Sequence, residues 1–593
     1  MTYLTPGDPK RRLRKIQISV VAIAVLFGAR LIDLQIIEAD AINAKSYSNR
    51  AVSRVLPSLR GDITDGANKV LAHTVFKYDV NAAPDIVAPF DRTVNGQKVL
   101  ISVEQAATEL AALVGQTQPE VLAKLIGTGK YSQVAKAVDA SVYRQIKKLD
   151  IPWLFYDPRP ARIYPNGAVA GGILGFLDPD GLPLEGIEVA QNACLAGKDG
   201  EETFEKGVDG IKIPSSAITT KAAVPGKKIK LTINADLQYF AQQILTANVA
   251  KLRADWGTAV VIEVKTGKIL VAADAPSYDP NEPSKSSVEN RGSRVFRTSF
   301  EPGSTMKMVT AATAIDAGKV TPESHFIAPF GMTIPHSNGY RVTDSHVHGN
   351  DKLTVAGVLR DSSNTGAMQI GNLVPWQTRY TYMQRFGVGS MPGSGFPGES
   401  AGLLNTKTTW GNDVVKRYVS TFGQGVSVTP LQSAMMYQAV ANKGVRLQPQ
   451  LIEGCIDSSG NLTKVTKDKA PVRVVTEASA KSTLDILEKV VEEGGIGKHA
   501  AVPGYRVGGK TGTAQIIDPN TGRYGNLHAI SFIGLAPVDD PQFVVAVTAY
   551  KSRTVSNSLG ATPIFKAIMS QVLRTYRVPP STTKSANIKT EWK

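Results

Sequence analysis

Cysteine is almost absent from this chain of 593 residues, which contains only Cys194 and Cys455. Two cysteines cannot build the disulfide framework of a small secreted domain, and neither lies in a metal-ligand spacing. The sequence leaves open whether they pair with each other. Histidine is also scarce, and the only close pair, His346 and His348, is expected in a surface loop. We therefore expect no metal site and no cofactor.

Runs of Arg and Lys interleaved with aromatic residues are absent as well, although the formal net charge is +16. Such runs are typical of nucleic-acid-binding surfaces, so nucleic acid is not an expected partner. A basic chain favours an anionic neighbourhood, and lipid head groups or acidic cell-wall polymers meet that requirement.

Long apolar runs are absent beyond residue 37, but one lies near the N-terminus, at residues 16–29, and continues past Arg30 to residue 37. A cleaved signal peptide has a similar core, but no small-x-small cleavage site follows, and Arg30 can snorkel to the interface. Five cations precede the run: Lys10, Arg11, Arg12, Arg14 and Lys15. Lys and Arg residues that flank a membrane span stay on its cytoplasmic side. We therefore expect a cytoplasmic basic tail (1–15), a single transmembrane anchor (16–37) in the plasma (inner) membrane, and an extracytoplasmic body beyond it.

The external body begins with a mixed, irregular region, residues 38–225, which we interpret as an elongated pedestal that serves as spacer and interaction module. Its pattern predicts two short strands near residues 60–65 and 69–72 and a helix over residues 103–114. No residue in this region indicates catalysis.

The pattern changes near residue 226, where alternating and helical periodicities become clear. We expect an α+β domain over residues 226–578 with one central antiparallel sheet flanked by helices. The predicted strands are 229–233, 258–264, 268–272, 530–535 and 543–550, and the predicted helices include 236–249 and 429–442. Residues 579–593, rich in Ser, Thr and Lys, are expected to form a disordered tail.

Three short motifs carry the chemistry: Ser304-Thr305-Met306-Lys307, Ser362-Ser363-Asn364 and Lys510-Thr511-Gly512-Thr513. Each motif recurs by chance in the chain, at Ser581–Lys584, Ser585–Asn587 and Lys265–Gly267. Context separates the copies. Ser304 opens an amphipathic helical pattern that ends at Gly318, whereas Ser581 lies in the tail and Lys265 in a hairpin turn.

Ser304 at a helix start would have free backbone N–H groups close to any developing negative charge. Lys307, one turn later, lies on the same face and is expected to share a proton with the hydroxyl. It acts as a base only when neutral, which requires burial and a neighbouring cation, for which Lys510 is the candidate. Further expected roles are a proton relay for Ser362, an acyl-chain contact for Asn364, substrate binding by Thr511, Gly512 and Thr513, and an oxyanion hole from the backbone N–H groups of Ser304 and Thr513.

The sequence resembles the class B penicillin-binding proteins, especially their division-type, septal members. The resemblance rests on the three motifs and on Asn290-Arg291, Phe300–Lys307, Phe422–Gly425, Thr429–Gln432, Arg60–Asp65 and Gly186–Glu188. One departure is Gly66-Ala67-Asn68, where the family has an Arg-Asn-Gly turn. The resemblance implies a peptidoglycan D,D-transpeptidase that cross-links stem peptides of lipid-linked precursor or nascent strands and is acylated by β-lactams. It also implies a membrane glycosyltransferase and divisome proteins as partners.

Several alternatives stay open at this point. A side-wall (elongation) transpeptidase would show the same motifs, as would a D,D-carboxypeptidase or a β-lactamase, although a β-lactamase needs neither pedestal nor anchor. A β-lactam sensor needs a cytoplasmic signalling domain, for which we expect no room in the fifteen residues before the apolar run. A pure division scaffold does not need the complete set of motifs.

Overall fold

The computed structural model describes residues 9–205, 216–518 and 520–593. The chain forms two compact units, the first from Met1–Leu59 and Gly197–Pro225, the second from Arg60–Ala196 and Gly226–Lys593. The expected pedestal, residues 38–225, therefore contributes to both units. Residues 1–8 of the predicted cytoplasmic tail lie outside the described residues.

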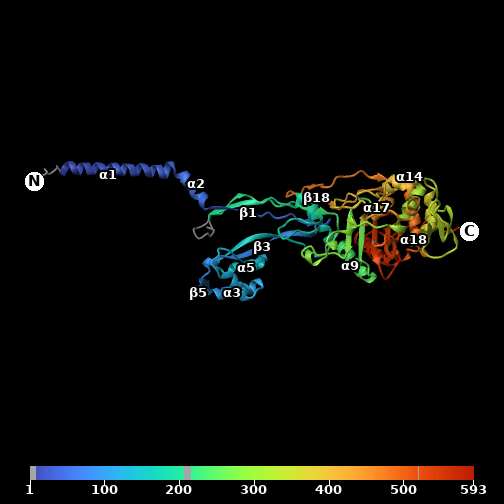
Figure 1. The fold of residues 1–593 in the computed structure, drawn as a ribbon, viewed down its shortest axis with the longest axis horizontal. Coiled ribbons are helices and arrows are strands. Elements are labelled where there is room, and N and C mark those ends of the chain that lie inside the picture. Colours follow the sequence, from blue (N-terminus) through green and yellow to red (C-terminus); the bar gives the residue numbers. More distant parts are fainter. Residues whose placement is uncertain (1–8, 206–215, 519) are drawn as a thin grey trace. The chain divides into compact units, whose positions relative to one another are not determined.

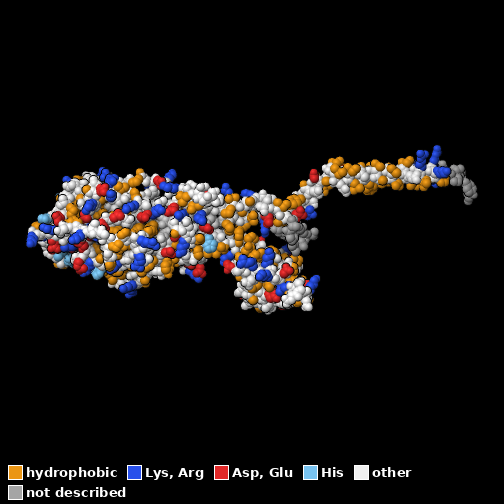
Figure 2. Space-filling view, turned by 180° about the vertical axis from the view of Figure 1, so that it is seen from behind, with side chains coloured by type: hydrophobic (Ala, Val, Ile, Leu, Met, Phe, Trp, Pro, Cys, Tyr) orange, Lys and Arg blue, Asp and Glu red, His pale blue; other side chains and the backbone are white. Residues whose placement is uncertain are grey.

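The first unit contains the apolar N-terminal helix. Within the described residues, one helical stretch, Pro9–Ile37, is long and apolar enough to span a membrane. It consists of α1 (Pro9–Ile32) followed by a π-helical turn (Asp33–Ile37), and α2 (Ala39–Arg50) continues the chain (Figure 1). Hydrophobic side chains cover α1, and Lys and Arg gather at its N-terminal end (Figure 2). None of the α1 side chains is buried by protein, so the helix requires an apolar surrounding.

A three-stranded antiparallel sheet completes the first unit. Its order is β1-β8-β9, and β1 and β8 pair along their full length, from Ala51 opposite Glu205 to Leu56 opposite Gly200. The strands are β1 (Ala51–Leu56), β8 (Gly200–Glu205) and β9 (Ile218–Lys221).

In the second unit, a seven-stranded sheet joins chain segments that are distant in sequence. Its order is β19-β18-β10-β2-β3-β6, and β7 pairs with β3. The strands are β2 (Ile63–Thr64), β3 (Val70–Ala82), β6 (Ser132–Val138), β7 (Leu154–Ile163), β10 (Lys228–Leu231), β18 (Ile452–Ile456) and β19 (Leu462–Thr463). A disulfide joins Cys194 to Cys455 of β18, with an S–S distance of 1.99 Å. The pairing that the sequence left open is thus resolved.

A helical lobe packs against β3, β6 and β7 of this sheet. The predicted helix at residues 103–114 is confirmed as α3 (Val103–Val114), which starts at the N-cap Ser102 and ends at Gly115 in a left-handed conformation. Around it lie α4 (Gln118–Leu125), α5 (Ala140–Lys148) and the hairpin of β4 (Phe90–Val94) and β5 (Gln97–Ile101).

A buried cluster of opposite charges lies where β7 meets the short helices α6 (Gly171–Leu174), α7 (Gly186–Ala190) and α8 (Asn192–Leu195). The Glu188 side chain is completely buried. Its two carboxylate oxygens accept from Arg60 Nε at 2.6 Å and Arg162 Nε at 2.7 Å, and Tyr164 donates its hydroxyl at 3.2 Å. Every charge in this cluster has an opposite partner at hydrogen-bonding distance.

The central sheet of the second unit is antiparallel throughout, as predicted. Its order is β12-β11-β23-β22-β21, which leaves β21 at an edge. Its strands are β11 (Trp256–Glu263), β12 (Ile269–Ala275), β21 (Gly508–Ile517), β22 (Tyr524–Ala536) and β23 (Phe543–Ser552). Alternate side chains along β11 and β23 enter two separate hydrophobic cores, one on each face of the sheet.

Helices cover both faces of this sheet, so the domain has three layers. The helices α9 (Ala235–Leu252) and α19 (Thr562–Thr575) pack on one face, whereas α17 (Pro430–Ala441) and α18 (Glu477–Val491) lie on the other. The helix α17 is buried on all sides. The remaining elements on this side are α10 (Arg294–Arg297), α11 (Lys307–Asp316), β13 (His325–Pro329), β14 (Gly331–Thr333), β15 (Arg341–Thr343), β16 (Asn350–Thr354), α12 (Val355–Arg360), α13 (Asn364–Asn372), α14 (Trp376–Phe386), α15 (Lys407–Asn412), α16 (Val414–Val419), β17 (Val445–Arg446) and β20 (Val472–Arg473).

The prediction of a disordered tail over residues 579–593 is wrong. Ser581 and Thr583 donate to the Asp539 carboxylate at 2.9 and 2.8 Å, and the Trp592 ring stacks on His325 with 4.8 Å between centroids. The composition suggested disorder because hydroxyl groups and lysines bury little apolar surface. Here the same hydroxyls are held by charged groups on the domain surface, which composition alone does not indicate.

Candidate active site

The site is built around Ser304, which lies in a short 3₁₀ turn, Gly303–Met306, that leads directly into α11. The predicted helix start at Ser304 is confirmed, but the helix is not amphipathic. Its residues from Lys307 to Ala314 are all buried. Gly303, at φ +55°, allows the turn to lie against β21, because a Cβ at this position would be 3.0 Å from the Cβ of Ala514.

Two lysines of separate motifs converge on one hydroxyl group beside this turn. Lys307 Nζ lies 3.2 Å from Ser362 Oγ, and Lys510 Nζ lies 2.9 Å from the same oxygen. Both side chains are buried, with exposed fractions of 1% and 0%. The three motifs, which are spread over about 200 residues of the sequence, thus meet at one place.

Lys307 is held entirely by the second motif. Its ammonium donates to the Ser362 carbonyl oxygen and, at 2.8 Å, to Asn364 Oδ1. In the described part of the chain, no hydrogen bond joins Ser304 Oγ to Lys307 Nζ. Such contacts are often long without substrate and tighten in the reacting complex, so proton sharing between the two stays a prediction.

Ser362 has an unusual backbone conformation. Its φ of +62° places it in the left-handed region, which residues with a Cβ rarely adopt. This turn directs both its carbonyl and its hydroxyl toward the lysines. Ser363 then caps α13 by accepting from Gly366 N at 2.9 Å.

Burial lowers the pKa of both lysines. The pKa of Lys307 falls to about 7, because desolvation disfavours the ammonium, while the Asp344 carboxylate opposes the shift. The pKa of Lys510 falls well below its ordinary value, first through burial and then through repulsion from Lys307. The predicted depression of Lys307 is therefore present, with burial rather than Lys510 as its main cause.

The third motif lies on the edge strand β21. Gly512 leaves room for Ser531, whose Oγ would be 2.2 Å from a Cβ at this position. Thr513 is exposed on the strand, but Thr511 is buried and its hydroxyl accepts from Lys510 Nζ at 2.9 Å. Of the two predicted substrate-binding hydroxyls, only that of Thr513 is open to the solvent.

Two protein-family models match this chain. The Penicillin binding protein transpeptidase domain matches residues 257–570, and the Penicillin-binding Protein dimerisation domain matches residues 55–231. The chain belongs to the penicillin-binding proteins. It is 33% identical to the penicillin-binding protein PbpB of Mycolicibacterium smegmatis, over 96% of this chain and 91% of the relative.

Two further relatives cover nearly the whole chain. The peptidoglycan D,D-transpeptidase FtsI of Escherichia coli is 31% identical, over 95% of this chain and 91% of the relative. The crystal structure of penicillin binding protein 3 of Mycobacterium tuberculosis complexed with aztreonam matches with a TM-score of 0.69 and 26% identity, over 91% of this chain and 100% of that one. The two-domain fold is thus that of a penicillin-binding protein with dimerisation and transpeptidase domains.

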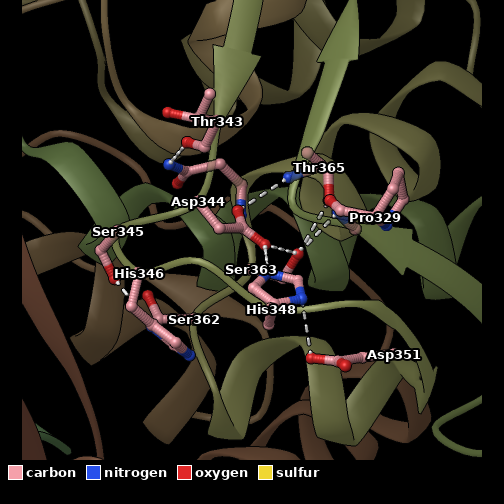
Figure 3. Close-up of polar contacts among 12 residues, drawn as sticks. Pro329, Thr343, Asp344, Ser345, His346, His348, Asp351, Ser362, Ser363 and Thr365 are labelled. Atoms are coloured by element: carbon pink, nitrogen blue, oxygen red, sulfur yellow. Dashed lines mark hydrogen bonds and ion pairs between the residues drawn. The ribbon is translucent and has the colours of Figure 1, made fainter.

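Sequence reasoning missed Asp344, which organises the second motif of this penicillin-binding protein (Figure 3). One of its carboxylate oxygens accepts from Ser363 Oγ at 2.7 Å and the other from the backbone N–H groups of Asn364 and Thr365. The carboxylate therefore neutralises the N-terminus of α13. Nothing in the sequence indicates this, because Asp344 lies 18 residues before Ser362 in a short loop.

The expected surface role of His348 is also corrected. Its Nε2 lies 3.0 Å from the Asp344 carboxylate, its Nδ1 lies 3.0 Å from that of Asp351, and only 12% of its side chain is exposed. Among the residues that the structure describes, His346 forms no ion pair of this kind. Within the described ranges, no group of three or more His, Cys, Asp or Glu side chains is placed to hold a metal ion.

A cavity of about 440 Å³ adjoins the site along the outer half of β21. Its lining includes Glu301, Gln515, Tyr524 and Tyr550. The Glu301 carboxylate accepts from Tyr524 at 3.0 Å and from Gly425 N at 2.8 Å, and burial raises its pKa. Sequence reasoning did not identify this cavity, because its walls come from several segments that lie far apart in the sequence.

Proposed function

We propose that this chain is a peptidoglycan D,D-transpeptidase that works through a Ser304 acyl-enzyme. The observation that carries the proposal is the convergence of two buried lysines, from the first and third motifs, on the hydroxyl of the second. Burying two lysine side chains next to each other costs free energy, so the arrangement indicates a function. Perturbed pKa values of this kind cluster at catalytic sites.

In the acylation step, Ser304 Oγ attacks the carbonyl carbon between the two D-alanines of a stem peptide. Neutral Lys307 takes the hydroxyl proton, which it can do at neutral pH because its pKa is about 7. The backbone N–H groups of Ser304 and Thr513 stabilise the negative charge that develops on the carbonyl oxygen. The bond to the terminal D-alanine nitrogen then breaks.

Ser362 passes a proton to the leaving amine, since its hydroxyl lies between the two lysine nitrogens. Lys510 and Thr513 bind the substrate carboxylate. An anion beside Lys510 favours its charged form and therefore offsets the depressed pKa of the free enzyme. Thr511 contributes indirectly, because its hydroxyl holds Lys510.

In the second half of the reaction, the amine of a neighbouring stem attacks the acyl-enzyme carbonyl, and Ser304 leaves with a proton. Among the described residues, Lys307 uses the amide oxygen of Asn364 and the Thr343 carbonyl one of its two N–H donors, so the second N–H is available to the acyl chain. An extended peptide can pair with the open edge of β21, next to the cavity lined by Glu301 and Tyr524.

The cellular setting is part of the same proposal. The basic cluster before the apolar helix keeps the N-terminus in the cytoplasm and the catalytic domain outside, where peptidoglycan lies. The enzyme acts in septal wall synthesis with a membrane glycosyltransferase and divisome proteins. The similarity to FtsI and PbpB along nearly their whole length supports this setting.

Covalent labelling with a fluorescent penicillin tests the nucleophile. We expect Ser304→Ala to abolish labelling and Ser581→Ala, in the chance copy of the first motif, to retain it. Labelled Ser304→Ala protein would refute the assignment. Incubation with a pentapeptide and an amine acceptor then separates the activities: cross-linked product supports a transpeptidase, and release of D-alanine alone supports a carboxypeptidase.

Imaging of a fluorescent fusion in growing cells tests the septal role. Rings at mid-cell are expected, whereas dispersed patches along the side wall would assign the enzyme to elongation.

A further inference from the structure

The residues near the C-terminus form a segment that docks beside the catalytic motifs. We call residues 588–592 the C-terminal strap. Trp592 donates its backbone N–H to the Lys352 carbonyl on β16 at 3.2 Å and its indole Nε1–H to the Phe326 carbonyl on β13 at 3.1 Å. Its ring stacks on His325 at an interplanar angle of 3° and lies 5.1 Å from Lys352 Nζ.

The strap also holds the N-terminal end of α12. Thr354, the N-cap of this helix, donates its backbone N–H to the Thr590 carbonyl at 3.0 Å and its hydroxyl to the Lys589 carbonyl at 2.7 Å. The approach is so close that a Cβ on Gly357 would lie 1.9 Å from the Thr590 carbonyl oxygen. This face of the helix is therefore shaped to receive the strap.

The C-terminal end of α12 is held by the same segment. Arg360, the last residue of the helix, donates to the Glu591 carboxylate at 2.6 Å and to the Thr590 hydroxyl. The same guanidinium binds both oxygens of Asp361 at 2.7 Å. Asp361 is followed directly by Ser362, so the second motif begins where the contact with the strap ends.

Ser362 tolerates little displacement. Its left-handed backbone directs one carbonyl and one hydroxyl at the two buried lysines. A displacement of a catalytic group by about 1 Å can lower the reaction rate about a hundredfold. The element that fixes the position of α12 therefore also fixes the proton relay.

We propose that the C-terminal strap is a positioning element of the active site, which acts through α12 and Arg360 on Ser362. This inference rests on the proposed role of Ser362. The alternative is that the strap only covers the edge of β16, as protecting segments do on other sheets. A cover contributes to stability but leaves the chemistry of the folded enzyme unchanged.

The test uses the full-length chain in detergent and two variants, Trp592→Ala and Glu591→Gln, with Lys593→Ala as the matched control. The acylation rate constant with a fluorescent penicillin is measured well below each melting temperature, across a pH range. We expect about tenfold slower acylation for Trp592→Ala and a smaller loss for Glu591→Gln. The pH at half-maximal rate should shift, because the hydroxyl between the two lysines is displaced.

Unchanged rate constants and pH profiles in both variants would overturn the proposal, including the case in which only their melting temperatures fall. A failure of the proposed function is distinguishable from this outcome. It would appear as an unlabelled wild-type enzyme or a labelled Ser304→Ala variant, whereas the strap proposal fails when the wild type labels through Ser304 and the strap variants label equally fast.

Discussion

Two buried clusters of charge lie in the same unit of the molecule and are built in opposite ways. Around Glu188, two arginines and a tyrosine satisfy one carboxylate, and opposite charges compensate each other. Around Ser362, two lysines share one hydroxyl, and the pKa of each is lowered by burial. The first cluster joins α7 to β7 and to the segment before β2, whereas the second lies beside a candidate nucleophile.

The difference separates what stabilises the fold from what carries out the reaction. Removing one partner from a compensated cluster leaves an unpaired buried charge, which is strongly destabilising. Removing one of two like charges relieves repulsion and desolvation instead, so stability is retained and only the chemistry is lost. Each cluster therefore predicts a different response to mutation.

The largest expected effect is on chemistry, in Lys307→Met. Without its base, Ser304 should react with penicillin at least about a thousandfold more slowly, as in enzymes that lose a member of a catalytic triad. The melting temperature should change little, because the relief from burying an amine offsets the loss of its hydrogen bonds to Ser362 and Asn364. Lys265→Met, in the chance copy of the third motif, is the control, and equal rates in both variants would contradict the assignment.

The next largest effect is on stability, in Glu188→Gln. Loss of the carboxylate leaves Arg60 and Arg162 without their shared partner and should lower the free energy of unfolding by about 3–5 kcal/mol. Denaturant unfolding followed by tryptophan fluorescence measures this, and the folded fraction should still be acylated. Asp468→Asn, which breaks the exposed pair with Lys464, should cost only about 0–1 kcal/mol. A comparable loss in the two variants would remove the distinction between the clusters.

An intermediate effect is expected for Asp344→Asn, which touches the second cluster from outside. The amide keeps the size of the side chain but cannot accept from all the partners that the carboxylate binds. Acylation should slow by about ten- to a hundredfold, since one lost hydrogen bond to a charged group costs about 1.5–3 kcal/mol. Stopped-flow labelling of the folded variant measures the rate, and an unchanged rate would show that Asp344 does not position the motif.

The smallest effect needs no mutation. Lys307 is a base only when neutral, so acylation should accelerate as the pH rises through its pKa of about 7. Between pH 6 and pH 8 the neutral fraction increases about tenfold, and the rate with a penicillin should follow it. A flat profile over this range would place the pKa of Lys307 elsewhere.

Much of the catalytic domain could be predicted because its signals are local. The helix start at Ser304, the hairpin of β11 and β12 and the strands β22 and β23 each follow from periodicity and turn residues. The ordered trio of motifs also named Lys307 and Lys510, whose amine groups both lie beside the Ser362 hydroxyl.

The remaining features depend on contacts between distant segments, which periodicity does not encode. Asp344 belongs to the site only because β15 ends beside α13, and Thr511 is turned toward Lys510 instead of the solvent. The tail is ordered because Asp539 and α12 offer partners to it. The strand β10, predicted as part of the catalytic domain, pairs with β2 of the pedestal, since its neighbours lie far away in the sequence.

The first unit is assembled from two separate stretches of chain, so the backbone passes between the units three times, at residues 59–60, 196–197 and 225–226. A pull on the membrane helix is therefore shared between a covalent link at residue 59 and the six paired positions of β1 and β8. A protease that cuts the first link would not free the enzyme at once, because β8 would still hold the anchor. Cleavage of the chain at this link would therefore not release the catalytic domain from its anchor until the pairing of β1 with β8 also opens.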